Sequence, residues 1–193
     1  MANINEETIK NKIKEANIAY LYSDFENAIA LYEEVYSMSC EVFGEDDPET
    51  VSTLNSIARL HHVIGNNEKT LEFDKRRYAA FCKAYGEKSP ETIKMLNEVA
   101  NSYLNVGDKE KAFDNFKKSY DISREVLGEE HPDTVGVLSC TAYACFQAGN
   151  KKEALEYYKT LQPLSSRVYG TEHKITLSAE RAIAVIPGML DNE

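Results

Sequence analysis

Apolar residues recur every three or four positions through most of this chain, in stretches separated by short polar segments that contain glycine or proline. After Thr50, for example, Val51, Leu54 and Ile57 follow this spacing until Gly65. Such spacing places the apolar side chains on one face of an α-helix. No stretch shows the alternation of a half-buried strand. The pattern therefore predicts an all-α fold.

The helical pattern repeats with a period of 42 residues. Nearly identical loop segments begin at Gly44, Gly86 and Gly128, and a decayed fourth copy begins at Gly170. A small residue recurs with the same period at Ala16, Ala58, Ala100, Ala142 and Ala184. A constant period shared by several segments is the signature of a repeat architecture, in which each unit packs on its neighbours.

Each 42-residue unit is expected to contain two helices. A proline follows Asp47, Ser89 and His131, which places it at the first helical position, where its missing N–H costs little. Turn residues recur near the middle of the units at Ser23, Gly65, Gly107 and Gly149, and a glycine there can adopt the left-handed conformation that ends a helix. The predicted units are residues 3–43, 44–85, 86–127 and 128–169.

One hairpin of this size cannot bury its own apolar face, so the units must stack into a superhelix with a concave and a convex wall. We therefore expect residues 1–193 to form a single domain. A capping helix is predicted over residues 173–186, ended by Pro187-Gly188. Its apolar run leaves two alternatives open. It is buried against the preceding hairpin, or it contacts another repeat or a second copy of the protein as a homodimer.

The charge balance narrows the class of partner. The chain has 22 Lys and Arg against 32 Asp and Glu, for a net charge of −10. This charge repels phosphate backbones and anionic bilayers, so nucleic acid and membrane are not expected partners. The polar, acidic N-terminus lacks the features of a signal peptide, and no apolar run of 18 residues occurs. We expect a cytoplasmic location.

No pattern of residues indicates catalysis, and no cofactor is implied. Phosphate-binding loops, HExxH and G-x-S-x-G motifs are missing from the sequence. The adjacent residues His61 and His62 would point about 100° apart on a helix, one to the core and one to the groove, so no metal site is expected. The four cysteines are Cys40, Cys82, Cys140 and Cys145. They show no CxxC spacing and lie on apolar helical patterns, so they are predicted to be reduced, buried thiols.

The repeat resembles tetratricopeptide repeats (TPR), in particular the 42-residue variety of kinesin light chains. The matching residues of one unit are Gly128, His131, Pro132, Thr134, Leu138, Ala142, Gly149 and Ala154. The resemblance implies a right-handed superhelical solenoid of four helix-turn-helix units with a C-terminal capping helix. It also implies a concave groove lined by the first helix of each unit, the A helix.

Counted from the recurring alanine, the groove positions implied by the resemblance hold twenty residues, none of which is Asp or Glu. We predict that a peptide is bound by the following members of this set: Lys10, Asn17, Tyr20, Ser52, Asn55, Arg59, His62, Lys94, Asn97, Asn101, Asn105, Ser139, Tyr143 and Gln147. Asparagine amides can pair with any peptide backbone. The cations suit an acidic side chain or a C-terminal carboxylate.

The sequence thus favours a protein–protein interaction scaffold or adaptor that is not an enzyme. Its expected ligand is an extended peptide or protein with acidic or neutral polar segments. Two alternatives remain. The chain could be a peptide-responsive regulatory module, or it could contact partners, including itself, through the convex face or the C-terminal helix.

Overall fold

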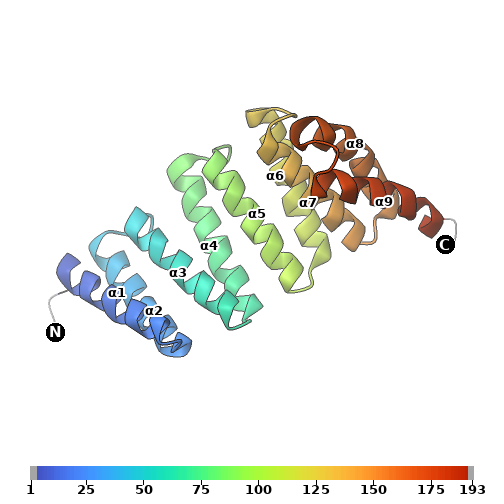
Figure 1. The fold of residues 1–193 in the computed structure, drawn as a ribbon. Coiled ribbons are helices and arrows are strands. Elements are labelled where there is room, and N and C mark those ends of the chain that lie inside the picture. Colours follow the sequence, from blue (N-terminus) through green and yellow to red (C-terminus); the bar gives the residue numbers. More distant parts are fainter. Residues whose placement is uncertain (1–3, 191–193) are drawn as a thin grey trace. The chain divides into compact units, whose positions relative to one another are not determined.

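A computed structural model describes residues 4–190 of the chain. These residues contain nine α-helices and no strand (Figure 1). The helices are α1 (Glu6–Leu21), α2 (Phe25–Val42), α3 (Pro48–Val63), α4 (Asn67–Tyr85), α5 (Pro90–Asn105), α6 (Lys109–Leu127), α7 (Pro132–Gln147), α8 (Lys151–Tyr169) and α9 (Lys174–Leu190). The all-α fold of four helix hairpins and a final helix is confirmed.

The chain forms two compact units that divide between Glu87 and Lys88. The first unit contains α1 to α4, and the second contains α5 to α9. Within each unit every helix packs on the helix that follows it in sequence. This consecutive packing is characteristic of a repeat solenoid. That the four hairpins act as one domain stays a prediction.

Side chains of the connecting loops define where the A helices begin. The Asp47 carboxylate accepts a hydrogen bond from the backbone N–H of Glu49 at 2.8 Å and so caps α3. The Nδ1 atom of His131 accepts from the backbone N–H of Asp133 at 3.1 Å and caps α7. Histidine is not among the preferred capping residues, so the sequence pattern did not assign it this role.

The turn inside each hairpin needs one residue in the left-handed conformation. Gly107, between α5 and α6, has φ +84°, which a glycine adopts without a steric cost. Ser23 occupies the same repeat position between α1 and α2 and has φ +61°. A residue with a Cβ atom is destabilised there by about 1 kcal/mol. The first hairpin therefore carries local strain that the others lack.

Small residues lie where the two helices of a hairpin cross. Ala142 of α7 and Ala154 of α8 are both fully buried, in a core that includes Phe116, Leu138 and Leu161. A residue without a bulky side chain lets the two helix axes approach and the larger neighbours interlock. The recurring alanines are thus explained by packing, as predicted. Ala184 is the exception, because it is exposed on α9.

Helix α4 differs from the other second helices on its inner face. Its Asp74 and Arg77 side chains are only 6% and 12% exposed and form an ion pair of 2.9 Å. The equivalent positions in the other hairpins hold mainly apolar residues, namely Tyr32 and Val35, Phe116 and Ser119, and Tyr158 and Leu161. The first unit therefore buries charge at a place where the repeat usually buries apolar side chains.

The final helix is longer than predicted. We expected it to end before Pro187, but α9 continues to Leu190. Proline removes a single backbone hydrogen bond in this last turn. Ile186 is 2% exposed and Leu190 packs against the core of the second unit, so tertiary contacts on both sides of the proline hold the helix. Of the two alternatives left open for this helix, the structure shows the first, since α9 packs on the preceding hairpin and contacts both α8 and α7.

Candidate functional site

The structure places most of the predicted groove residues at the surface of the A helices. The exposed members are Lys10, Asn17, Tyr20, Ser52, Arg59, His62, Lys94, Asn101, Asn105 and Tyr143. The half-buried members are Asn55, Asn97, Ser139 and Gln147. The amide oxygen of Asn97 is covered by surrounding atoms, which leaves it less accessible to a ligand than Asn101.

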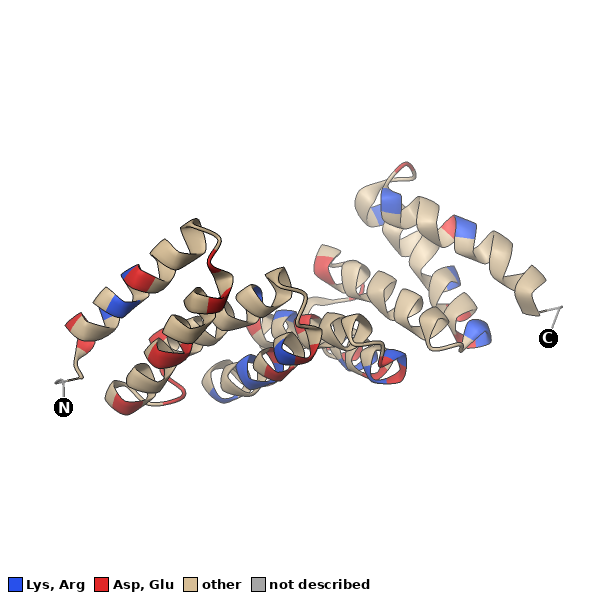
Figure 2. Ribbon diagram, turned by 90° about the horizontal axis from the view of Figure 1, so that it is seen from below, with Lys and Arg blue, Asp and Glu red and all other residues tan. Residues whose placement is uncertain are grey.

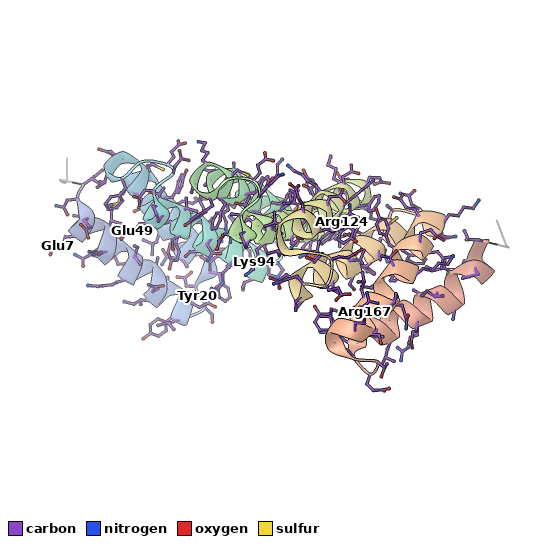
Figure 3. All side chains as sticks on the ribbon, turned by 90° about the horizontal axis from the view of Figure 1, so that it is seen from above. Glu7, Tyr20, Glu49, Lys94, Arg124 and Arg167 are labelled. Carbon is purple, nitrogen blue, oxygen red and sulfur yellow. The ribbon has the colours of Figure 1, made fainter. Side chains whose placement is uncertain are left out.

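The three predicted groove cations differ in their surroundings. Lys10 is paired with Glu6 on the same helix, and this hydrogen bond raises the pKa of the Lys10 ammonium. An acidic residue therefore lies beside the predicted acid-free face. Arg59 and Lys94 make no ion pair with any described residue. Both side chains are exposed, and Figure 3 labels Lys94 on α5. They are the cations of this face that a ligand can use.

Arg59 lines a hollow of about 180 Å³ in the first unit, which we call the Arg59 hollow. It is lined by Asn17 and Tyr20 of α1, Tyr32 of α2, and Ser56, Arg59 and Leu60 of α3. Figure 3 shows the Tyr20 side chain near the end of α1. Asn17, Tyr20 and Arg59 were predicted as groove residues, and the structure brings them together. None of the lining residues is acidic.

A second hollow in the first unit, which we call the Phe81 hollow, lies between α3 and α4 and measures about 260 Å³. Its charged groups are already paired. Arg77 is held by Asp74, and Asp46 accepts from the Lys83 ammonium at 3.1 Å. It is lined by Asp46, Pro48, Val51, Ser52, Asn55, Arg77, Ala80, Phe81, Ala84 and Tyr85. Two predicted groove residues, Ser52 and Asn55, are in this set.

The second unit contains a hollow of about 290 Å³ without a charged side chain, which we call the Tyr143 hollow. Its lining residues are Asn101, Leu104, Phe116, Ser139, Cys140, Tyr143, Tyr158 and Ser178. Burial raises the pKa of the Tyr158 hydroxyl, so this group remains protonated near neutral pH. A lining of aromatic rings, hydroxyls and one amide suits an uncharged ligand group.

The cysteines were predicted to be buried, and for Cys140 this is wrong. All four cysteines are free, but Cys145 alone is fully buried and Cys140 is exposed. Cys140 lines the Tyr143 hollow on α7. Burial raises the pKa of the Cys145 thiol to about 12. That thiol is therefore protonated and unreactive near neutral pH.

The two adjacent histidines have the environments that helical geometry predicts. His61 is buried and its ring stacks on Phe73 with centroids 5.6 Å apart, whereas His62 is exposed. Across residues 4–190 no group of three or more His, Cys, Asp or Glu side chains could hold a metal ion. In the same part of the chain no helix has both the length and the apolar character required to cross a membrane.

Sequence reasoning missed the contribution of the second helices to these hollows. Tyr32 lines the Arg59 hollow, and Phe116 and Tyr158 line the Tyr143 hollow. These three residues occupy one position of the 42-residue repeat, so an aromatic residue recurring there was a usable signal. Asp74 is the exception at this position.

Comparisons with known proteins agree with this architecture. Two sequence models described as tetratricopeptide repeat match residues 16–49 and 91–161. The nearly identical TPR-like repeats of a kinesin light chain candidate from Podosopora anserina share the fold with a TM-score of 0.74 and 18% identity, over 100% of this chain and 90% of that one. No curated protein matches the sequence.

Two other solved structures are similar. The apo form of RapI has a TM-score of 0.73 at 15% identity, over 94% of this chain and 48% of its own. YrrB, a TPR protein with an unusual peptide-binding site, has a TM-score of 0.58 at 12% identity, over 94% of this chain and 77% of its own. At such identities the likeness concerns the fold. The two repeat matches, which together cover more than half of the sequence, make this chain a tetratricopeptide repeat protein.

Proposed function

We propose that this protein is a non-catalytic interaction scaffold of the cytoplasm that binds an extended segment of a partner protein on the faces of its A helices. The observation that carries the proposal is the placement of the hollows. The Arg59 hollow and the Tyr143 hollow both open among residues that the resemblance to tetratricopeptide repeats implied, and neither is lined by an acidic residue. YrrB, which has a similar fold and a peptide-binding site, supports the same reading.

The chemistry of the two hollows suits a peptide better than a small metabolite. Exposed amides such as Asn101 can donate to and accept from a peptide backbone regardless of its sequence. Tyr20 and Tyr143 are 42% and 50% exposed and can pack against apolar anchors. Each unit thus offers backbone recognition together with an aromatic contact.

A peptide array tests this function. Wild-type protein is compared with an Arg59→Glu/Asn101→Ala variant, which changes one hollow in each unit at exposed positions. The matched control is Lys75→Glu/Asn27→Ala, with the same changes at exposed positions of α4 and α2. We expect peptides bound by the wild type to be lost by the first variant and retained by the control. Equal binding by all three proteins would move the binding site away from the A helices.

Self-association is a second candidate, and one observation favours it. Val185 and Met189 of α9 are 52% and 38% exposed, and no charged residue follows Arg181 within the helix (Figure 2). Sedimentation of the wild type and of a Val185→Glu variant tests this candidate. A dimer that the substitution dissociates supports it, whereas a wild-type monomer at high concentration rules it out.

A further inference from the structure

The hairpin turns of the first unit expose a group of apolar side chains. Leu21 and Tyr22, at the end of α1, are 77% and 83% exposed, and Val63 and Ile64, at the end of α3, are 52% and 43% exposed. Both turns lie at the same edge of the unit (Figure 1). We call these four residues, together with the exposed Ile18 of α1, the turn patch.

The turns of the second unit differ. Their equivalent positions hold the polar residues Asn105 and Gln147 and the partly buried residues Val106 and Ala148. The repeat therefore folds without exposed apolar side chains at these positions. An exposed apolar patch that the fold does not require is typical of an interaction surface.

The outer face of α1 corresponds to the place where other units receive a helix. Ile18 is 53% exposed, whereas Leu60 of α3 and Ala144 of α7, at the same repeat position, are 2% and 0% exposed. Ala144 lies one turn after Thr141, whose hydroxyl donates to the Phe116 carbonyl oxygen of α6 at 3.2 Å. The preceding helix therefore covers this face of α7. No helix precedes α1 in the part of the chain that the structure describes, so a helix is the element that fits there.

Acidic residues border the turn patch. Glu26 and Glu68, in the first turns of α2 and α4, are exposed and form no ion pair with another described residue. Ten acidic residues and no Lys or Arg lie between Lys14 and Arg59. Arg59 itself lines the hollow on the A-helix face. An apolar surface with an acidic rim attracts a basic partner and repels an anionic bilayer.

The acidic character is particular to α2 among the second helices. Glu33 and Glu34 are exposed on α2, at the repeat position where α4 has the exposed cations Lys75 and Arg76. Helix α6 has two lysines at this position. The reversal of charge extends the acidic surface from the first turn of α2 along the helix, which favours a partner with several basic side chains.

We propose that the turn patch binds a basic amphipathic helix of a partner protein. The apolar face of that helix packs on the turn patch, and its Lys or Arg side chains lie beside Glu26 and Glu68. This surface is at the hairpin turns, whereas the proposed peptide site is on the faces that carry the hollows. Binding at the turn patch is therefore a separate function, and a protein with both sites connects two partners.

Three fluorescent peptides of about 18 residues test this surface without knowledge of the natural partner. The basic probe has leucine at the spacing of one helical face and lysine elsewhere. The acidic probe has glutamate in place of lysine, and the scrambled probe has the composition of the basic probe without an apolar face. In fluorescence anisotropy the wild type should bind the basic probe about tenfold more tightly, or better, than either of the others.

A first variant tests the apolar contact. Leu21→Asn/Val63→Gln introduces the residues that the equivalent turns of the second unit already hold, so the hairpins should keep their fold, as far-UV circular dichroism checks. The matched control is Val42→Asn/Val126→Gln, at valines that are 37% and 40% exposed. Binding of the basic probe should weaken about tenfold or more in the first variant and stay unchanged in the control.

A second variant tests the charge of the rim. Glu26→Lys/Glu68→Lys should weaken binding of the basic probe and strengthen binding of the acidic probe. Glu110→Lys/Glu129→Lys makes the same change of net charge at exposed positions of the second unit and should change neither affinity by more than about twofold.

Several results would overturn the proposal. They are equal binding of the basic and scrambled probes, no binding of the basic probe by the wild type, undiminished binding by Leu21→Asn/Val63→Gln, and an equal loss in the control variants. A wild-type dimer that Leu21→Asn/Val63→Gln dissociates in sedimentation would also overturn it, because the turn patch would then bind a second copy of the chain.

Discussion

The ion pair between Asp74 and Arg77 offers a quantitative test of how α4 is stabilised. Both side chains lie on the inner face of the helix and are less than 13% exposed, with 2.9 Å between guanidinium nitrogen and carboxylate oxygen. The Arg77→Met substitution keeps a long side chain at this position but removes the charge. The Asp74 carboxylate would then remain in a site with little access to water.

The expected cost follows from this burial. Removing one partner of a buried ion pair usually destabilises a protein by about 3 to 5 kcal/mol. We expect a loss of about 3 kcal/mol, at the lower end, because Arg77 also borders the Phe81 hollow, through which water can approach. The double variant Asp74→Leu/Arg77→Met removes both charges. Its free energy of unfolding should lie within about 1 kcal/mol of that of the wild type, since apolar residues often replace buried ion pairs without loss of stability.

Urea unfolding followed by far-UV circular dichroism measures these free energies. Lys83→Met is the matched control, because it breaks the Asp46–Lys83 pair, in which both side chains are more than half exposed. Exposed pairs contribute little to stability, so this variant should resemble the wild type. A loss in the double variant as large as that in Arg77→Met would refute the reasoning, because the cost would then come from altered packing and not from separating the Asp74 carboxylate from the Arg77 guanidinium.

Three further predictions concern single residues. Ser23→Gly should stabilise the protein by about 0.5 to 1 kcal/mol in urea titrations, because glycine adopts the positive φ at this position without strain. The control Ser37→Gly, at an exposed position inside α2, should destabilise the protein. Leu138→Ala should lower the free energy of unfolding by about 3 kcal/mol, because Leu138 is fully buried. Burial lowers the pKa of His61 from its ordinary value of about 6.5. The His61 side chain therefore binds a proton more readily in the unfolded chain than in the folded protein. The stability contributed by neutral His61 is fully present above about pH 6.5 and falls as the pH drops below that value. His61→Phe should flatten this slope below about pH 6.5, and a slope equal to that of the wild type would contradict the prediction.

The candidate site was predicted in part. The resemblance to tetratricopeptide repeats implied that Asn17, Tyr20 and Arg59 line one face of the A helices, and all three line the Arg59 hollow. The predicted set left out Tyr32, which reaches the hollow from the second helix of the hairpin, although the recurring aromatic residue at its repeat position was a usable signal. The pairing of Lys10 with Glu6 was also overlooked, although its i,i+4 spacing on one helix is a sequence signal for such a pair.

Sequence alone determined the helices and the pairing of helices into hairpins. Their boundaries depend on local interactions, such as the Asp47 cap before Pro48 and the left-handed turn at Gly107. These interactions join residues within one turn of each other, so a linear pattern contains the information needed to predict them. The 42-residue period also showed which hairpins are equivalent to one another.

Only the tertiary structure decided where α9 ends and which hydrogen bonds join side chains of different helices. α9 continues past Pro187 because Ile186 and Leu190 pack on the second unit, and this long-range packing outweighs a local signal to stop. The Tyr32–Asn17 hydrogen bond likewise joins two helices and sets the Asn17 amide as a donor. Such features depend on side chains that are distant in sequence and meet only after the helices have packed.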